Sequence, residues 1–122
     1  MNEPNRIGLS KEANDLLDEM LAALNAKAEG SQLIKFDFYR LSVALGVKNH
    51  TKAAPIESTD SLRVDELDKD KALYYSVEST GLRKTDEPIY RAVERLADHG
   101  IREFYKVFKE NMDELDWAKL LS

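Results

Sequence analysis

Two histidines, His50 and His99, are the side chains of this sequence that titrate nearest to neutral pH and that most often bind metals. They lie far apart along the chain, and neither has the His-Glu-x-x-His spacing that places two metal ligands on one helix face. There is no cysteine, so disulfides, thiolate zinc sites and cysteine nucleophiles are excluded. We therefore predict that the protein uses no metal and no cofactor.

His99 stands between Asp98 and Gly100, a context that favours the last turn of a helix. We expect its ring to interact there with the negative end of the helix dipole. A hydrolase that uses His99 with Asp98 is a more distant alternative, and it would need a sizeable pocket around His99.

Carboxylates form two groups that could be imagined as acid–base pairs or as an oxygen-donor metal site. They are Asp15, Asp18 and Glu19, and Asp65, Glu66, Asp68 and Asp70. The first group belongs to the solvent face of a predicted helix, and the second lies where a helix dipole favours negative charge. The second group also lacks the glycine and the distal glutamate of a calcium-binding loop. We interpret both groups as structural.

Basic side chains form three groups. They are Lys48, His50 and Lys52; Arg83 and Lys84; and Arg91, Arg95, Arg102, Lys106 and Lys109. Glu87 and Glu94 can pair with Arg91 and Arg95, so we expect a solvated face of mixed charge there, with a phosphate-contacting patch as the minority alternative. The net charge of −5 provides no overall attraction to nucleic acid.

Helices must position these side chains, because apolar residues recur at helical spacing through most of the chain. The sequence predicts a compact all-α bundle of about five helices in a single domain spanning residues 1–122, with a short N-terminal strand as an option. Ser10 can cap the first helix. The second helix should run from Ile34 to Leu45 and form the centre of the core, with Gly46 in the left-handed position after its end.

Further helices are expected in the second half. The predicted boundary residues are Asp68 and Gly81 for the third helix and Thr85 and Gly100 for the fourth, with Pro88 tolerated in the first turn of the fourth. Tyr74 and Tyr75 cannot face the same way, so one of them should be exposed. A final apolar helix follows Gly100, and the cluster around Trp117 should pack on the core or against a partner.

Two segments lack helical periodicity. Residues 1–6 read as a loose N-terminus, and residues 47–63 read as the longest loop, rich in Lys, Asn, Thr, Ser and Pro. A loop of this length in a small domain is often functional, so it is the best single stretch in which to expect binding, with a plain connector as the alternative.

Several runs, taken together, resemble a known family. They are Arg6-Ile-Gly-Leu-Ser10, Phe38-Tyr-Arg-Leu-Ser-Val-Ala-Leu-Gly-Val-Lys-Asn49, Ala54-Pro-Ile56, Lys71-Ala-Leu-Tyr-Tyr-Ser-Val-Glu-Ser-Thr80 and the span from Tyr90 to Tyr105. In order and pattern they resemble the small family of DNA phosphorothioation-associated proteins termed dnd system-associated protein four. The resemblance implies a bacterial or archaeal accessory protein of genome defence, and it carries no active-site residue with it.

A second resemblance involves the beginning of the chain. Arg6-Ile-Gly-Leu-Ser10, followed by Lys-Glu-Ala and a leucine-rich helix, is similar to the opening of ribbon-helix-helix DNA binders and of the helical sulfur-modification protein DndE. In a ribbon-helix-helix protein, this strand pairs with that of a dimer mate and enters the major groove. The resemblance would place Arg6 and Gly8 on one face of the strand and Ile7 and Leu9 on the other.

Together these patterns favour a non-enzymatic accessory protein that acts through protein–protein contacts in a bacterial DNA-modification or antiviral defence complex. A dimeric DNA-binding regulator, with Arg6 and the basic loop on DNA, is the alternative. The residues we expect to contact a partner or DNA are Arg6, Lys48, Asn49, His50, Lys52, Arg83, Lys84 and Trp117. No stretch approaches the roughly 20 apolar residues needed to span a bilayer, and cysteine is absent, so we expect no membrane contact and a cytoplasmic protein.

Overall fold

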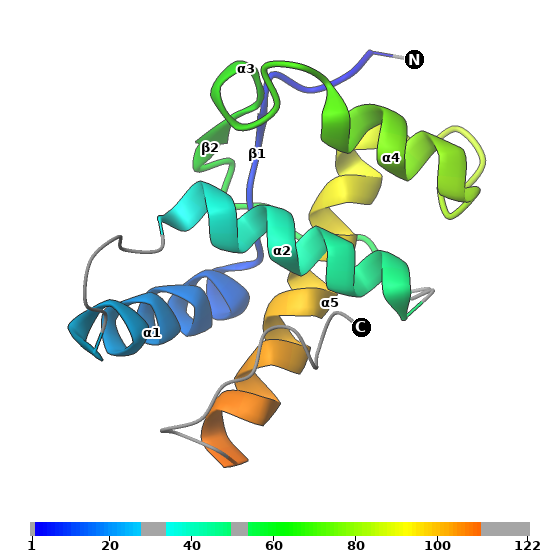
Figure 1. Ribbon diagram of the computed structural model, residues 1–122. Helices are drawn as coiled ribbons and strands as arrows, with labels where there is room; N and C mark the ends of the chain where they lie inside the picture. The colour runs from blue at the N-terminus through cyan, green and yellow to red at the C-terminus, as the bar shows by residue number, and fades with distance from the viewer. Residues whose placement is uncertain (1, 28–33, 50–53, 111–122) are drawn as a thin grey trace.

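The computed structural model describes residues 2–27, 34–49 and 54–110, and within them the chain is mostly helical, as predicted (Figure 1). The elements are β1 (Arg6–Ile7), α1 (Lys11–Lys27), α2 (Lys35–Lys48), β2 (Leu62–Arg63), α3 (Val64–Leu67), α4 (Ala72–Thr80) and α5 (Ile89–Glu110). The expected five helices and short N-terminal strand are therefore confirmed. Of the predicted partner-contact residues, His50, Lys52 and Trp117 lie outside the described part of the chain.

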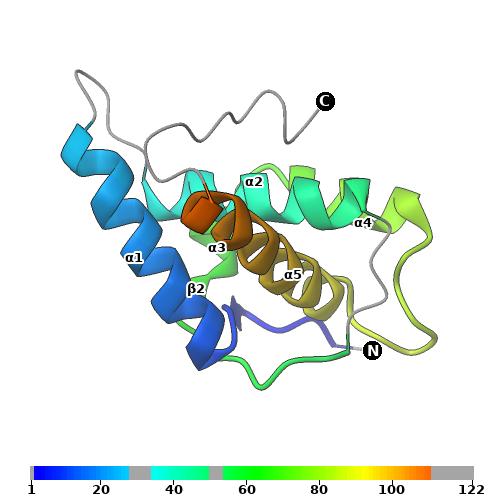
Figure 2. The same cartoon turned by 90° about the horizontal axis from the view of Figure 1, so that it is seen from below.

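The central helix is α5 and not the expected α2. Every residue from 92 to 98 is buried, so this part of α5 is covered on all sides. It lies between α2 on one side and, on the other, residues 54–61 together with residues 2–10, which we call the N-terminal segment (Figure 2). The core consists of apolar side chains from α1, α2 and α5, with Ile7, Leu9 and Leu62 from the strand region.

Two glycines allow α2 and α5 to cross at close range. A Cβ atom on Gly46 would stand 2.4 Å from the carbonyl oxygen of Leu96, and one on Gly100 would stand 1.9 Å from that of Ser42. Both glycines lie inside helices, so the predictions that Gly46 follows the end of the second helix and that Gly100 ends the fourth are wrong. The physical reason is that each position has no room for a side chain, whereas the predictions assumed that glycine was needed for a left-handed backbone.

Local signals at the ends of α1 and α4 are confirmed. The Ser10 hydroxyl accepts a hydrogen bond from the Ala13 amide at 3.2 Å, and Gly81 ends α4 with a φ of +73°. Tyr75 is exposed, whereas Tyr74 is half-buried. α4 starts at Ala72, later than predicted, although the Asp68 carboxylate still caps it.

The N-terminal segment is not a loose end, and Thr85 is not the cap of α5. The carboxylate of Glu3 accepts hydrogen bonds from the amides of Ile89 and Tyr90, both at 2.9 Å. A carboxylate is favoured at a helix N-terminus, because the first amides have no partner within the helix. The cap is thus supplied from 86 residues away in sequence.

The predicted loop of residues 47–63 is shorter at both ends than expected. α2 continues through Lys48, because Gly46 stays helical, and Leu62–Arg63 pairs with β1 as an antiparallel strand. The register places Arg6 opposite Arg63 and Ile7 opposite Leu62. Ile7 and Leu62 point into the core, and the two arginines point outward.

We predict that Gly100→Ala destabilises the fold by more than about 3 kcal/mol, because the added methyl group would overlap a backbone carbonyl that cannot move alone. Gly81→Ala is the matched control: its Cβ would meet no atom within 4 Å, so only the left-handed backbone opposes it, at about 1 kcal/mol. Urea denaturation of both variants measures the difference. Equal, small losses would contradict the close helix crossing.

We also predict that Glu3→Ala lowers the unfolding free energy by about 1 kcal/mol, the usual value of a helix cap. Thr85→Ala should change it by less than about 0.5 kcal/mol, as is usual for a surface substitution, because Thr85 is exposed. Thermal denaturation of the two variants compares them directly. A larger loss of stability for Thr85→Ala than for Glu3→Ala would indicate that Thr85, and not Glu3, caps α5.

Candidate functional site

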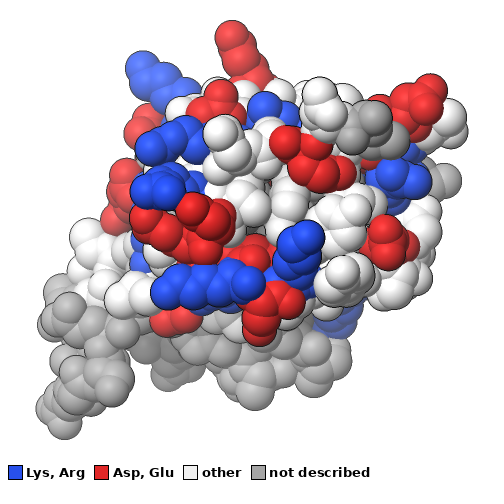
Figure 3. Space-filling view, turned by 90° about the horizontal axis from the view of Figure 1, so that it is seen from above, with Lys and Arg blue, Asp and Glu red and all other residues white. Residues whose placement is uncertain are grey.

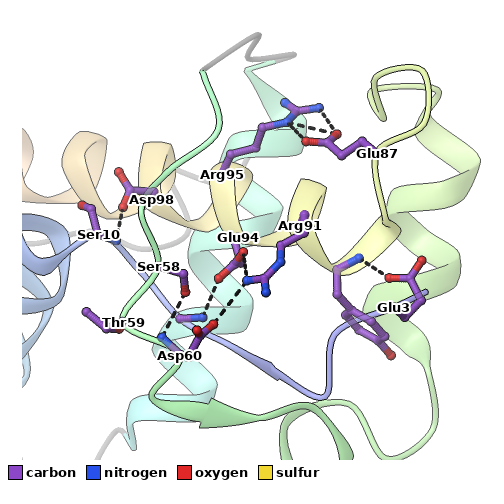
Figure 4. A network of polar contacts seen from close by, with 12 residues as sticks. Glu3, Ser10, Ser58, Thr59, Asp60, Glu87, Arg91, Glu94, Arg95 and Asp98 are labelled. Atoms are coloured by element: carbon purple, nitrogen blue, oxygen red, sulfur yellow. Dashed lines mark hydrogen bonds and ion pairs between the residues drawn. The ribbon is translucent and has the colours of Figure 1, made fainter. Parts of the chain in front are cut away.

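The charged side chains at the start of α5 are largely buried and serve the fold (Figure 4). Arg95 is only 1% exposed, and its Nε lies 2.9 Å from the Glu87 carboxylate. Arg91 Nη1 lies 2.7 Å from the buried Glu94 carboxylate and 3.2 Å from Asp60. The predicted ion pairs therefore form. The expectation of a solvated face is wrong for Arg95 and Glu94, which residues 54–61, the N-terminal segment and the α4–α5 connection cover, whereas Arg91 remains partly exposed.

Two carboxylates on α5 hold the N-terminal segment in place. Glu94 Oε2 accepts the amide of Gly8 at 3.0 Å, and Asp98 Oδ2 accepts the amide of Ser10 at 2.8 Å. Residues four apart on a helix rise by about 6 Å, and alternate residues of an extended chain advance by about 6.7 Å, so the two spacings match. The Tyr39 hydroxyl donates to the carbonyl oxygen of Gly8 at 2.7 Å, so both the amide and the carbonyl of Gly8 are hydrogen-bonded.

Gly8 is buried, which corrects the expectation that it shares an outward strand face with Arg6. A side chain there would meet the Thr59 hydroxyl at 2.6 Å. The strand of Arg6 and Ile7 also pairs with β2 of the same chain. Of these two residues, Arg6 is exposed and Gly8 is not.

His99 and Asp98 do not form an acid–base pair. His99 lies in the middle of α5 and not in its last turn, because the helix continues through Gly100 to Glu110. Its Nε2 lies 3.2 Å from the Asn49 side-chain nitrogen. Asp98 is engaged by Ser10 and by Arg102 Nε, at 2.9 Å for the latter, so its carboxylate already serves the fold.

The structure distributes the described partner-contact candidates over three elements. Arg6 is exposed on β1, Lys48 and Asn49 form the exposed end of α2, and Arg83 and Lys84 are exposed in the connection between α4 and α5. Asn49 is brought to His99, and the amide of Lys84 donates to Glu87 at 3.1 Å. The side chains of both charge signs interleave on the face that carries α3 and α4 (Figure 3).

Sequence reasoning missed a groove between the start of α2 and α4. Its volume is about 810 Å³, and its lining includes Ile34, Phe36, Leu67 and Leu73. Arg40 fixes one wall: Nε and Nη2 both donate to the carbonyl oxygen of Leu67, at 3.1 and 2.7 Å, and its guanidinium lies 6.0 Å from the Phe36 ring centre. These contacts within the chain hold that wall of the groove in place.

Ile34 is 54% exposed, and it occupies the N-cap position of α2 without a side-chain hydrogen bond to the helix. Serine, threonine, aspartate or asparagine would stabilise that position, and isoleucine is among the poorest choices. A single exposed apolar side chain is common on protein surfaces, but Ile34 adjoins the apolar lining of the groove, and a contiguous apolar patch is typical of a binding site. The isoleucine is visible in the sequence, but its unfavourable position is recognised only when the first residue of α2 is known.

Burial raises the pKa of the Tyr39 phenol well above its usual value, and the negative charges of Glu94 and Asp98 raise it further. The pKa of Glu87 is shifted the other way. Burial alone would raise it, but the hydrogen bonds from Arg95 and from the Lys84 amide outweigh burial and lower the pKa. Both groups are thus held in their ordinary neutral-pH forms, phenol and carboxylate.

We predict that Tyr39 makes the fold sensitive to alkali. Its raised pKa means that its contribution to stability is complete below about pH 10, where an unfolded tyrosine begins to ionise, and is lost as the pH rises through the folded-state pKa. Tyr39→Phe should cost about 1–3 kcal/mol at pH 7, because the buried Gly8 carbonyl loses its partner. The difference between the two proteins, measured by denaturation from pH 7 to 11, should shrink above pH 10. A constant difference would contradict this assignment.

Among the described residues, no group of three or more His, Asp or Glu side chains is arranged to hold a metal ion. The same part of the chain contains no helix with the length and apolarity to cross a membrane. Comparison with protein-family models, with curated proteins and with solved structures gives no match to this chain.

Proposed function

We propose that this chain is a non-catalytic accessory protein that binds another protein through the groove beside Ile34. The observation that carries the proposal is the exposed isoleucine at the N-cap of α2, next to a partly apolar groove. The buried ionisable groups support it as well, since Glu94, Asp98, Arg95 and Asp68 are all engaged in holding the fold.

The chemistry of the groove defines the partner surface. Phe36 and Leu73 offer contacts to an apolar anchor side chain, and the charged part of the lining is mixed, with Glu66 and Asp70 beside Arg40 and Lys69. A partner with an apolar residue flanked by charged residues of both signs matches this combination. From the resemblance to the phosphorothioation-associated family, we further propose that this partner belongs to a bacterial DNA-modification or antiviral defence complex.

We predict that Ile34→Ser weakens partner binding about tenfold, since it removes roughly 1.5 kcal/mol of apolar burial at the interface. Serine is a favoured N-cap residue, so the variant should be at least as stable as the original protein. Ala44→Ser is the matched control, because Ala44 is an exposed residue of the same helix that does not line the groove. The measurement is an affinity pull-down of each tagged protein from its native cell, with and without nuclease, read by mass spectrometry.

The expected result is recovery of DNA-modification or restriction proteins by the original chain and by Ala44→Ser. Their recovery should survive nuclease and should fall for Ile34→Ser. Equal recovery by all three proteins would reject the groove as the binding site. Recovery of nuclease-sensitive DNA alone would reject the accessory-protein function and favour the DNA-binding regulator.

A further inference from the structure

A second cavity, of about 560 Å³, opens beside the β1–β2 pair, and four cationic residues line it: Arg6, Arg63, Lys69 and Lys71. Two carboxylates, Asp65 and Asp68, also line the cavity. Val64 and Tyr90 add apolar surface. The volume falls within the usual range of about 300–1,000 Å³ for small-molecule sites.

The two arginines of this cavity stand directly opposite each other. Arg6 and Arg63 are register partners in the antiparallel pair, and both point away from the core. Like charges at such positions destabilise a strand pair. This repulsion between two arginines costs stability, and residues that cost stability often serve binding. Beside a cavity, two adjacent positive charges favour the binding of an anion.

The carboxylates nearby do not neutralise all four cations. Arg63 is paired with Asp65 at 2.8 Å and with Glu66 at 3.5 Å. The side chains of Arg6 and Lys69 form no hydrogen bond or ion pair within residues 2–27, 34–49 and 54–110. Lys71 Nζ lies 5.7 Å from the centre of the Tyr74 ring and has no carboxylate partner in the same part of the chain.

Asp68 is not available to these cations as a free countercharge. Its oxygens accept the amides of Leu73 and Tyr74 at 2.9 and 3.0 Å and the Tyr90 hydroxyl at 2.8 Å. The helix N-termini beside the cavity are occupied too, that of α4 by Asp68 and that of α5 by Glu3. An anion in the cavity would therefore be held by the cationic side chains and not by helix amides.

We propose that this cavity binds a phosphate-bearing small molecule, with Arg6 and Lys69 supplying the main contacts. A guanidinium fork and an ammonium group complement phosphate oxygens, and the Val64 and Tyr90 side of the cavity can contact the organic part of the ligand. An extended nucleic-acid backbone is disfavoured, because Arg91, Arg95 and Arg102 are bound to carboxylates and the net charge is −5. The cavity shares Asp68 and Lys69 with the lining of the groove beside Ile34, but the proposal does not depend on the function proposed for that groove.

The test is isothermal titration calorimetry with inorganic pyrophosphate. Arg6→Gln and Lys69→Gln should each weaken binding about tenfold or more, the usual effect of losing a charged hydrogen bond. Lys106→Gln is the matched control: it removes the same charge from an exposed pair with Glu103, and it should change binding less than about twofold.

Thermal denaturation supplies a second readout. Pyrophosphate should raise the unfolding midpoint of the original protein and of Lys106→Gln, and it should raise that of Arg6→Gln much less. Without ligand, Arg6→Gln should unfold at the same temperature as the original protein or higher, since it relieves the repulsion of Arg63.

Two outcomes would overturn the proposal. If the original protein shows no binding at millimolar pyrophosphate, or if all variants bind alike, the cavity is not an anion site. If a 16-base-pair DNA duplex displaces pyrophosphate and its own binding is lost in Arg6→Gln, the phosphate belongs to a nucleic-acid backbone and the small-molecule assignment is wrong.

Discussion

Backbone contact between α2 and α5 sets the distances at which every other element reaches the core. Gly46 lies against Leu96, and Gly100 lies against Ser42, so the two helices approach without side chains between them. At that separation, the Tyr39 hydroxyl on α2 reaches the carbonyl oxygen of Gly8, the residue whose amide Glu94 holds from α5. A wider crossing would pull these two anchors apart, and the N-terminal segment would lose one of them.

Short-range signals predicted the parts of this fold that depend on neighbours in sequence. Ser10 and Gly81 act as cap and stop because their effects reach only a few residues. Gly100 was misjudged because its reason for being glycine is a carbonyl on another helix. The candidate site divides in the same way. Arg6 was expected as a contact residue from the ribbon-helix-helix resemblance at the start of the chain, whereas the groove beside Ile34 is assembled from parts of α2, α3 and α4 that are distant in sequence.

The two candidate sites share a wall. Asp68 and Lys69, in the connection between α3 and α4, line both the groove and the cationic cavity. The carboxylate of Asp68 joins the start of α4 to the Tyr90 hydroxyl on α5, so this wall is anchored to the central helix. A ligand that draws Lys69 into the cavity would also change the charge that the groove presents to a protein, which gives the two sites a direct physical connection.

The long separation between Glu3 and α5 has a consequence for the chain during its synthesis. The amides that Glu3 caps, and the carboxylates that hold Gly8 and Ser10, are all made more than eighty residues later. Until α5 has emerged from the ribosome, Ile7 and Leu9 have no core to enter, and the first strand stays exposed to solvent and chaperones. The N-terminal segment can therefore take up its final position only after α5 has been made, because its hydrogen-bond partners lie on that helix.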